Sequence, residues 1–376
     1  MTRKRQADVA IYAPHATALY IEAGEAPGGA ELQSFYLARA LAEAGLHVRH
    51  IVAPHRMLRS AGGIEIVQLP DHWREHGLAR RRALLHALRA ADASVYVQRS
   101  AGFATALIAA YARVTRRRFL FSMSSDADIV LDGRTAQEAG AGLDAWRVRA
   151  EYRLGLRLAD AVVTQTQHQH EVARRNFGIV TRTIPSFAPA VVEPADRRPE
   201  AFLWVGRLSG VKDPLAYVEL ARRVSEARFW MVGADRGRER DTLATTVEAA
   251  ASEIPNLEIL PPRPRIDMLR LYERTVALVN TSLLEGFPNT FLEAWRRGVP
   301  VLSLRVDPDD VIARRGLGAV AGGSHDELAK AARDTWRGRR EIGDVSARVR
   351  EYVASRHDPT VVGPQWVALV RSLLPP

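Results

Sequence analysis

Cysteine is absent from this sequence of 376 residues. The absence excludes disulfide bonds, thiolate metal sites and a cysteine nucleophile, and it is compatible with a reducing compartment. Long apolar runs are also lacking. No stretch approaches the roughly 20 apolar residues that span a bilayer, and the apolar run after the basic N-terminal residues is too short for a signal peptide. We therefore expect a cytoplasmic protein, either soluble or peripheral at the inner face of the membrane.

Acidic residues are outnumbered by basic ones, which gives a net charge of +10. The excess comes largely from arginine, in clusters such as residues 80–82 and 116–118. Such runs are usually solvated helix faces, and both lack the interleaved aromatic residues of a protein that binds single-stranded nucleic acid. The charge therefore predicts no nucleic-acid partner, while it favours peripheral contact with an anionic membrane or a charged acceptor.

The chain is longer than the about 250 to 300 residues that one hydrophobic core usually serves, so we expect two domains. Apolar runs of strand length alternate with segments of helical period, which is typical of a parallel α/β sheet covered on both faces. In the N-terminal half, the expected strands are 8–13, 47–53, 93–98, 117–122 and 160–165, and the expected helices are 30–44, 79–91, 103–114, 142–159 and 167–177.

The alternation stops at a segment rich in proline and charge, and then it restarts. In the second half, the expected strands are 202–206, 228–233, 257–260, 276–280 and 299–304. The sequence thus predicts a first domain over residues 1–185, a linker over 186–200, and a second domain over 201–355. Residues 356–376 contain an amphipathic helix that we expect to pack back on the first domain. Ligands of such folds bind at the carboxyl ends of the strands.

Two motifs follow strands of the second domain. In Gly-Arg-Leu-Ser-Gly-Val-Lys-Asp-Pro, Gly206 permits close backbone approach, and Arg207 and Lys212 place two cations just past the strand. Such a pair can neutralise a diphosphate, since arginine is a planar fork and lysine a point charge. By itself, the pair also fits an ordinary charged surface.

The second motif is Glu-Gly-Phe-Pro-Asn-Thr-Phe-Leu-Glu, which begins at Glu285 and ends at Glu293. Glu285 is expected in a loop between strand and helix, with Asn289 or Thr290 as the helix cap. Free amides at the start of that helix can bind anionic or hydroxyl oxygens. Glu293 is then expected early in the helix, where a glutamate also stabilises the helix dipole without any further function.

In order and over nearly the whole chain, these motifs resemble the retaining GT-B glycosyltransferases of the family 4 type, also called glycosyl transferases group 1. The Gly-Val-Pro-Val strand at 298–301 and Pro-Gly-Gly-Ala-Glu at 27–31 complete the likeness. The resemblance implies an α/β fold of GT-B type, with two Rossmann-like doubly wound domains facing across a cleft. It implies transfer of a hexose from a UDP- or GDP-sugar to a glycan, lipid-linked or small-molecule acceptor, with retention of configuration and without a cofactor.

The resemblance also implies roles for individual residues. Arg207 and Lys212 would hold the diphosphate and stabilise the charge of the leaving group, and Glu285 would engage the donor sugar. Glu293 would accept hydrogen bonds from the ribose, and the base would lie near residues 260–263. The implied substrate-binding residues are Gly28, Gly29, Gly206, Arg263, Gly286, Phe287, Pro288, Asn289, Thr290 and Glu293.

The acceptor side departs from the family pattern, because Phe-Ser-Met-Ser-Ser-Asp-Ala-Asp replaces the usual His-Asp after the middle strand of the first domain. Asp126 is the best match for a carboxylate that orients the acceptor. Asp126 and Asp128 also form a D-x-D triplet which, on an extended strand, could face one metal ion. Arg207 and Lys212 already supply the positive charge, so we expect no metal, a mild effect of Asp128→Asn and a larger effect of Asp126→Asn.

Three alternatives remain open from the sequence. A nucleotide-sugar epimerase shares the two-domain architecture. A glycosidase would need Glu285 and Glu293 to flank a glycosidic bond about 5 to 10 Å apart, which a shared loop and helix make awkward. A basic nucleic-acid-binding protein without enzymatic activity rests only on net charge.

Overall fold

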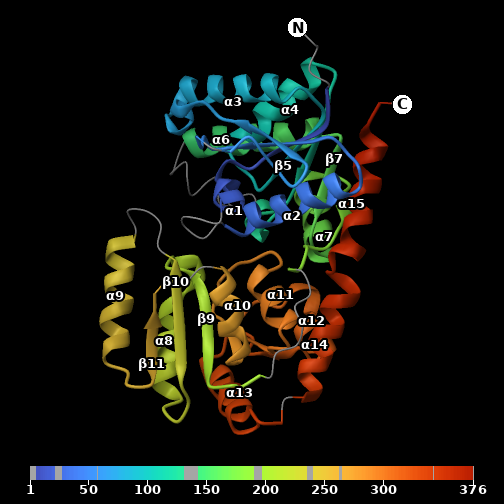
Figure 1. Ribbon diagram of the computed structural model, residues 1–376. Helices are drawn as coiled ribbons and strands as arrows, with labels where there is room; N and C mark the ends of the chain where they lie inside the picture. Colours follow the sequence, from blue (N-terminus) through green and yellow to red (C-terminus); the bar gives the residue numbers. More distant parts are fainter. Residues whose placement is uncertain are drawn as a thin grey trace. The chain divides into compact units, whose positions relative to one another are not determined.

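The computed structural model describes residues 6–21, 28–56, 58–130, 143–189, 197–234, 240–261, 265–341 and 343–375. The chain divides into two compact units. Unit 1 comprises Met1–Phe187 and Pro359–Pro376, and unit 2 comprises Ala188–Asp358 (Figure 1). Each unit is built around its own sheet.

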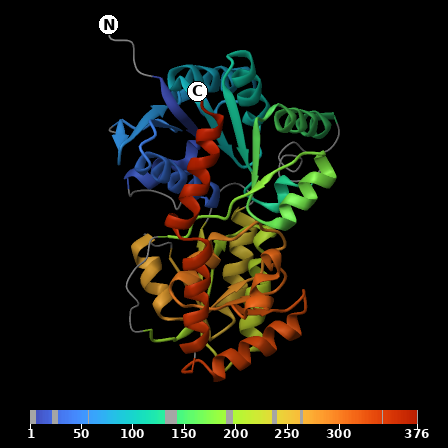
Figure 2. The ribbon, with the colours of Figure 1, turned by 90° about the vertical axis from the view of Figure 1, so that its right-hand side faces the viewer.

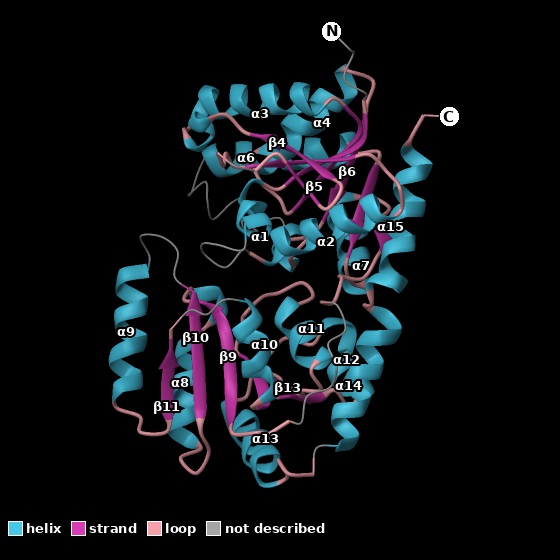
Figure 3. Cartoon of the chain, viewed as in Figure 1, coloured by secondary structure: helices cyan, strands magenta, loops and turns pink. Residues whose placement is uncertain are grey.

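Unit 1 contains a sheet in the order β3-β4-β2-β1-β5-β6-β7-β8, in which every neighbouring pair is parallel except β3 and β4. Its strands are β1 (Ala7–Tyr12), β2 (Val48–Val52), β3 (Ser60–Ala61), β4 (Ile64–Gln68), β5 (Ala93–Arg99), β6 (Arg118–Ser122), β7 (Ala161–Thr164) and β8 (Arg182–Thr183). The central strands β1 and β2 are almost completely buried because helices cover both faces of the sheet, as in other parallel sheets (Figure 3).

Two cores lie on the two faces of this sheet. One face packs against α3 (Gly77–Ala91), α4 (Ala104–Val114), α6 (Leu143–Leu158) and α7 (Gln167–Phe177), and the other against α2 (Gly29–Glu43) and α15 (Pro359–Leu373). Gly155 lets α6 approach α4 closely, because a Cβ there would lie 2.9 Å from the Thr105 methyl group. The C-terminal helix α15 lies along α2, where Arg371 donates a hydrogen bond to the carbonyl of Ala44 (Figure 2).

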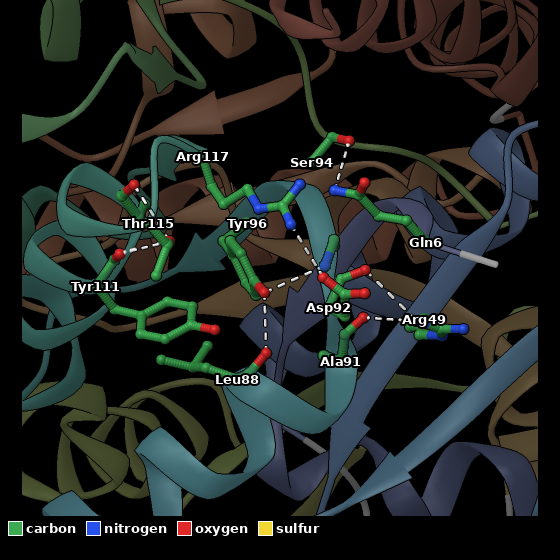
Figure 4. A network of polar contacts seen from close by, with 12 residues as sticks. Gln6, Arg49, Leu88, Ala91, Asp92, Ser94, Tyr96, Tyr111, Thr115 and Arg117 are labelled. Atoms are coloured by element: carbon green, nitrogen blue, oxygen red, sulfur yellow. Dashed lines mark hydrogen bonds and ion pairs between the residues drawn. The ribbon is translucent and has the colours of Figure 1, made fainter. Parts of the chain in front are cut away.

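A polar network closes the amino ends of the unit 1 strands (Figure 4). Arg49, on β2, is only 1% exposed, and its guanidinium donates to Glu65 Oε2 at 2.9 Å and to the carbonyl oxygen of Ala91 at 2.9 Å. Tyr96 donates to the carbonyl of Leu88 at 2.9 Å. These buried donors are therefore matched by acceptors, as the cost of burying an unpaired polar group requires.

Unit 2 has a fully parallel sheet in the order β11-β10-β9-β12-β13-β14. Its strands are β9 (Ala201–Arg207), β10 (Phe229–Ala234), β11 (Leu257–Leu260), β12 (Thr275–Asn280), β13 (Val301–Ser303) and β14 (Gly318–Val320). One face packs against α8 (Pro214–Arg223), α9 (Arg240–Ser252) and α13 (His325–Arg337). The other packs against α10 (Arg265–Glu273), α11 (Asn289–Arg296), α12 (Val311–Arg315) and α14 (Gly343–Arg356).

The predicted fold class, two Rossmann-like α/β sheets, is confirmed. Four strands were not predicted, namely β3, β4, β8 and β14, and three of these have only two or three residues. β8 lies just before the predicted linker and pairs with β7. At the end of that linker, Arg197 donates to the carbonyls of Gly298 and Thr275, which ties this residue to unit 2. Residues 190–196, in the middle of the predicted linker, lie outside the described part of the chain.

Candidate active site

The structure joins the two sequence motifs of unit 2 through an ion pair. Lys212 ends a short 3-10 helix, η4 (Gly210–Lys212), that follows β9, and Glu285 lies in the loop after β12. The Lys212 ammonium pairs with Glu285 Oε1, which also accepts a hydrogen bond from Ser282 Oγ at 2.8 Å. Because β9 and β12 are neighbouring parallel strands, their carboxyl ends bring together residues that are 73 positions apart.

Hydrogen bonds join the loop after β9 to the loop after β12. Thr281 Oγ1 donates to the carbonyl of Lys212 at 2.9 Å, and the Leu283 amide donates to the carbonyl of Val211 at 2.8 Å. Trp204, on β9, donates from its indole nitrogen to Thr281 Oγ1 at 3.0 Å. The backbone of Lys212 is therefore held against the loop after β12, and the Glu285 contact positions its ammonium.

Gly206 has a packing role in this structure. A Cβ at this position would lie 2.9 Å from the indole ring of Trp204, so glycine makes room for that ring. The sequence analysis expected a close approach to the backbone at Gly206, and in the structure the group that approaches it is the Trp204 ring. Arg207 is the last residue of β9 and is exposed, at the same edge of the sheet as Lys212.

Arg305 is a third cation at this edge that the sequence analysis missed. It follows β13, and its guanidinium donates to Asp213 Oδ2 at 3.2 Å and to the carbonyl of Thr281 at 3.1 Å. Asp213 lies in the left-handed region at φ 47°, ψ 58°, a backbone conformation that costs energy for a residue other than glycine. The sequence signal for Arg305 was an arginine that follows a buried strand. That strand, β13, lies next to β12, the strand that precedes the Glu285 loop.

The helix after the second motif begins at Asn289. Pro288 occupies the cap position, and no side chain there makes a capping hydrogen bond. The prediction that Asn289 or Thr290 caps this helix is therefore wrong, because both residues already lie inside its first turn. Asn289 and Thr290 still begin α11 directly after the loop that holds Glu285.

The loop between Glu285 and α11 is anchored in the core. Gly286, Phe287 and Pro288 are buried, and the Phe287 ring packs 4.6 Å from the His357 ring and 6.1 Å from the Trp295 ring, centroid to centroid. Only the backbone of Phe287 is therefore suited to contact a ligand.

Glu293 belongs to α11, and its carboxylate accepts a hydrogen bond at 3.2 Å from the hydroxyl of Tyr272, on α10. It does not share the Lys212 contact of Glu285. At the end of β11, Leu260 is buried in the core of unit 2, and Arg263 lies outside the described residues.

In unit 1, Gly28 is the cap residue of α2 and Gly29 is its first residue. A Cβ at Gly28 would lie 2.4 Å from a carboxylate oxygen of Glu31, so the side chain one turn on occupies the space over this glycine. Asp126 lies beyond the carboxyl end of β6 and accepts a hydrogen bond at 3.0 Å from Gln169, on α7.

The structure places the two aspartates of the D-x-D triplet in a 3-10 helix, η3 (Asp126–Asp128), so the expected extended conformation is wrong. Asp128 is 1% exposed, and its carboxylate accepts hydrogen bonds from the amides of Ala101, Ser124 and Ser125 and from the Ser124 hydroxyl. Its oxygens are thus committed to holding two loops together, as in a capping box.

Over the described residues, no group of three or more histidine, aspartate or glutamate side chains is arranged to hold a metal ion. Over the same residues, no helix combines the length and the apolar character needed to cross a bilayer.

Comparison with known proteins identifies related sequences. Residues 199–337 match the family model described as Glycosyl transferases group 1. Glycosyltransferase 1 domain-containing protein 1 of Xenopus tropicalis is 28% identical over 166 residues, which cover 42% of this chain and 48% of the relative. The chain therefore matches about half the length of this curated relative.

Solved structures match over nearly the whole chain. Sucrose-phosphate synthase from Thermosynechococcus elongatus is 17% identical, with a TM-score of 0.76, and the match covers 98% of this chain and 99% of that one. HepE from Anabaena, solved in complex with UDP-glucose, is 14% identical with a TM-score of 0.77, over 98% of this chain and 100% of that one. The chain has the GT-B fold, and together with the match of its second unit to Glycosyl transferases group 1 this supports a GT-B glycosyltransferase.

Proposed function

We propose that this protein transfers a sugar, a hexose, from a UDP- or GDP-sugar to an acceptor with retention of anomeric configuration. The observation that carries the proposal is the Lys212–Glu285 ion pair at the adjoining carboxyl ends of β9 and β12. Sheets of this kind bind their ligands at that edge. The family match over residues 199–337 covers both motifs.

The ion pair is compatible with a diphosphate site. A phosphate oxygen of the donor would take the place beside Lys212 that the Glu285 carboxylate oxygen holds in the ion pair. A diphosphate carries more negative charge than one carboxylate, so it competes well for the ammonium, with Arg207 as the second cation. Glu285 is then released toward the hydroxyls of the donor sugar.

Residue usage supports a special role for Lys212. Only three of the 53 lysine and arginine residues are lysines, namely Lys4, Lys212 and Lys330. A compact point charge is therefore present at the one edge where a strongly charged leaving group would bind, in a chain that otherwise uses arginine.

The chemistry assigned to these groups is stabilisation of the leaving diphosphate. In a retaining transfer, the departing phosphate takes the acceptor proton on the same face of the sugar, so no strong protein nucleophile is needed. Arg207, Lys212 and the first-turn amides of α11 supply positive charge where negative charge develops. Neither a metal nor a cofactor is required in this mechanism, and Glu293 contributes binding through the ribose hydroxyls.

On the acceptor side, we propose that Asp126 orients the attacking hydroxyl of a glycan, a lipid-linked saccharide or a small molecule. We also propose that Gly28 and Gly29, at the start of α2, contact the donor phosphate through their backbone. We place the reaction in the cytoplasm, with the arginine clusters favouring contact with the anionic inner face of the membrane.

The test is thermal unfolding of the full chain with UDP, GDP and ADP. A ligand at 100 times its dissociation constant stabilises by about 2.7 kcal/mol, so at least one diphosphate should raise Tm clearly. Lys212→Ala should abolish this shift and lower turnover by about 10²- to 10³-fold, whereas Lys330→Ala, at an exposed site on α13, should do neither. If no diphosphate stabilises the parent, the proposal fails. Incubation with a nucleotide sugar alone separates transfer from epimerisation.

A further inference from the structure

Arg99 is a buried cation that the proposed donor site does not use. It is the last residue of β5, at the carboxyl edge of the unit 1 sheet. Its Nη1 donates to Ser122 Oγ at 2.9 Å. Within the described residues, its Nε and Nη2 atoms are both buried without a hydrogen-bond partner. Two unmatched donors on one charged group are costly to bury.

Arg49 shows what a structural arginine looks like in the same sheet. Its guanidinium donates to the Glu65 carboxylate. It also donates to the backbone carbonyls of Ala91 and Asp92, at the opposite, amino end of the strands (Figure 4). Arg99 has a single neutral hydroxyl instead. The difference leaves two donors of Arg99 unmatched within the described residues, more than on any other arginine for which the structure shows unmatched donors.

The charge of Arg99 persists despite its burial. Burial lowers the pKa of Arg99 to about 10, and the nearby Asp128 carboxylate acts in the opposite direction. Asp128 does not complete the guanidinium, because its own oxygens already accept from the amides of Ala101, Ser124 and Ser125 and from the Ser124 hydroxyl. Near neutral pH the site therefore holds a cation that has a nearby opposite charge but lacks acceptors for its Nε and Nη2 donors.

The position of Arg99 connects it with the acceptor side. It neighbours Ser122 in register, and the loops that follow β5 and β6 are joined by the hydrogen bond from the Ala101 amide to Asp128. That second loop also carries Asp126, the proposed acceptor-orienting carboxylate. Arg99 as a whole residue is half-buried, but its Nε and Nη2 atoms are buried, so a ligand reaches them only after the side chain rotates.

We propose that Arg99 binds an oxyanion of the acceptor, either a phosphate or a carboxylate, as a two-donor fork. The assignment of this oxyanion to an acceptor rests on the proposed function. Anion binding at Arg99 does not depend on that function. Asp126 would then engage a hydroxyl and Arg99 the charged group, so the pair selects acceptors that carry a negative charge. A neutral sugar would leave the guanidinium donors unmatched, which is the kind of difference that gives strong discrimination.

The experiment titrates inorganic phosphate and, separately, acetate against the full chain at constant ionic strength, with Tm as the readout. It uses Lys212→Ala as the background, so that phosphate binding at the donor site does not contribute. We expect a saturable rise of Tm with at least one of the two anions, and the anion that acts tells phosphate from carboxylate. Adding Arg99→Met should raise the apparent dissociation constant by about tenfold or more, because charged hydrogen bonds are lost.

The matched control is Arg49→Met. Without ligand, Arg49→Met should lower Tm, since it leaves Glu65 and buried carbonyls unmatched. Arg99→Met should lower Tm less, because it removes one hydrogen bond to Ser122 while the Asp128 carboxylate keeps its four hydrogen bonds. The inference is overturned if neither phosphate nor acetate raises Tm in a saturable way. It is also overturned if adding Arg99→Met to Lys212→Ala leaves anion binding unchanged, or if Arg99→Met lowers Tm as much as Arg49→Met does. Binding of UDP to the parent without an Arg99 effect would leave the proposed function standing. An Arg99-dependent anion effect without any nucleoside diphosphate binding would refute the function and keep the site.

Discussion

Asp126 and Asp128 are two positions apart, yet the structure gives them opposite roles. Asp126 is half-buried beside Gln169, while Asp128 is buried and accepts four hydrogen bonds. The sequence predicts a mild effect of Asp128→Asn because no metal is expected at the triplet. The structure changes that expectation, because an asparagine would turn an NH2 donor toward groups that are themselves donors.

Asp128→Asn should therefore destabilise unit 1 by about 1 to 3 kcal/mol, the cost of leaving buried donors unmatched. Asp126→Asn should preserve stability and lower turnover, since its carboxylate is assigned to the acceptor hydroxyl. Urea unfolding and a transfer assay on the same preparations check both. Equal stability of the two variants would show that the Asp128 hydrogen bonds matter less than the geometry indicates.

Glu293 provides a test of binding without chemistry. If it holds the ribose, Glu293→Ala should raise the donor KM more than it lowers kcat, because such a contact acts equally in the ground and transition states. Tyr272→Phe removes only the hydroxyl that donates to Glu293, so it should give a smaller effect in the same direction. A loss confined to kcat in Glu293→Ala would instead place this carboxylate at the reacting atoms.

At the scale of elements, the short strand β14 depends on a glycine. Gly318 has φ +151° and pairs with Val301 of β13, and a Cβ at Gly318 would lie 1.8 Å from the Val301 carbonyl oxygen. The two backbones are therefore closer than any side chain allows. This close approach is also why a three-residue edge strand that begins with glycine gives no strand signal in the sequence.

Gly318→Ala should separate β14 from β13 and destabilise unit 2. Gly316→Ala is the matched control, since Gly316 also has a positive φ, +61°, but a Cβ there would meet nothing closer than the Arg348 side chain at 3.5 Å. The control should cost about 1 to 2 kcal/mol from backbone strain alone, and Gly318→Ala should cost more. Chemical unfolding of both variants measures the difference, and equal losses would contradict a backbone clash.

At the scale of the whole molecule, the proposed mechanism makes no use of a metal. We expect transfer to proceed unchanged with excess EDTA, because Arg207, Lys212 and the α11 amides carry the positive charge at the diphosphate. The measurement is turnover with EDTA, with EDTA followed by manganese, and without either. Complete loss in EDTA that manganese restores would replace the proposed mechanism with a metal-dependent one.

The sequence by itself determined the alternation of strands and helices, the two-sheet fold class, and the loops that contain Lys212 and Glu285. These features follow from hydrophobic periodicity and from turn-forming residues such as glycine and proline. Both signals depend only on residues that are close in sequence. The start of α7 at Gln167 and the span of β11 from Leu257 to Leu260 agree with expectation residue for residue, because each is bounded by clear local signals.

Only the tertiary structure decided which of these residues meet. The Lys212–Glu285 contact depends on β9 and β12 being neighbours, and strand order is not encoded in local periodicity. The same holds for Asp128, whose hydrogen bonds come partly from the loop after a different strand, and for Arg305, which reaches Asp213 from β13. Arg99 is the clearest case, since its sequence neighbours say nothing about missing acceptors. An unmatched buried donor becomes visible only when every surrounding group has a position in space.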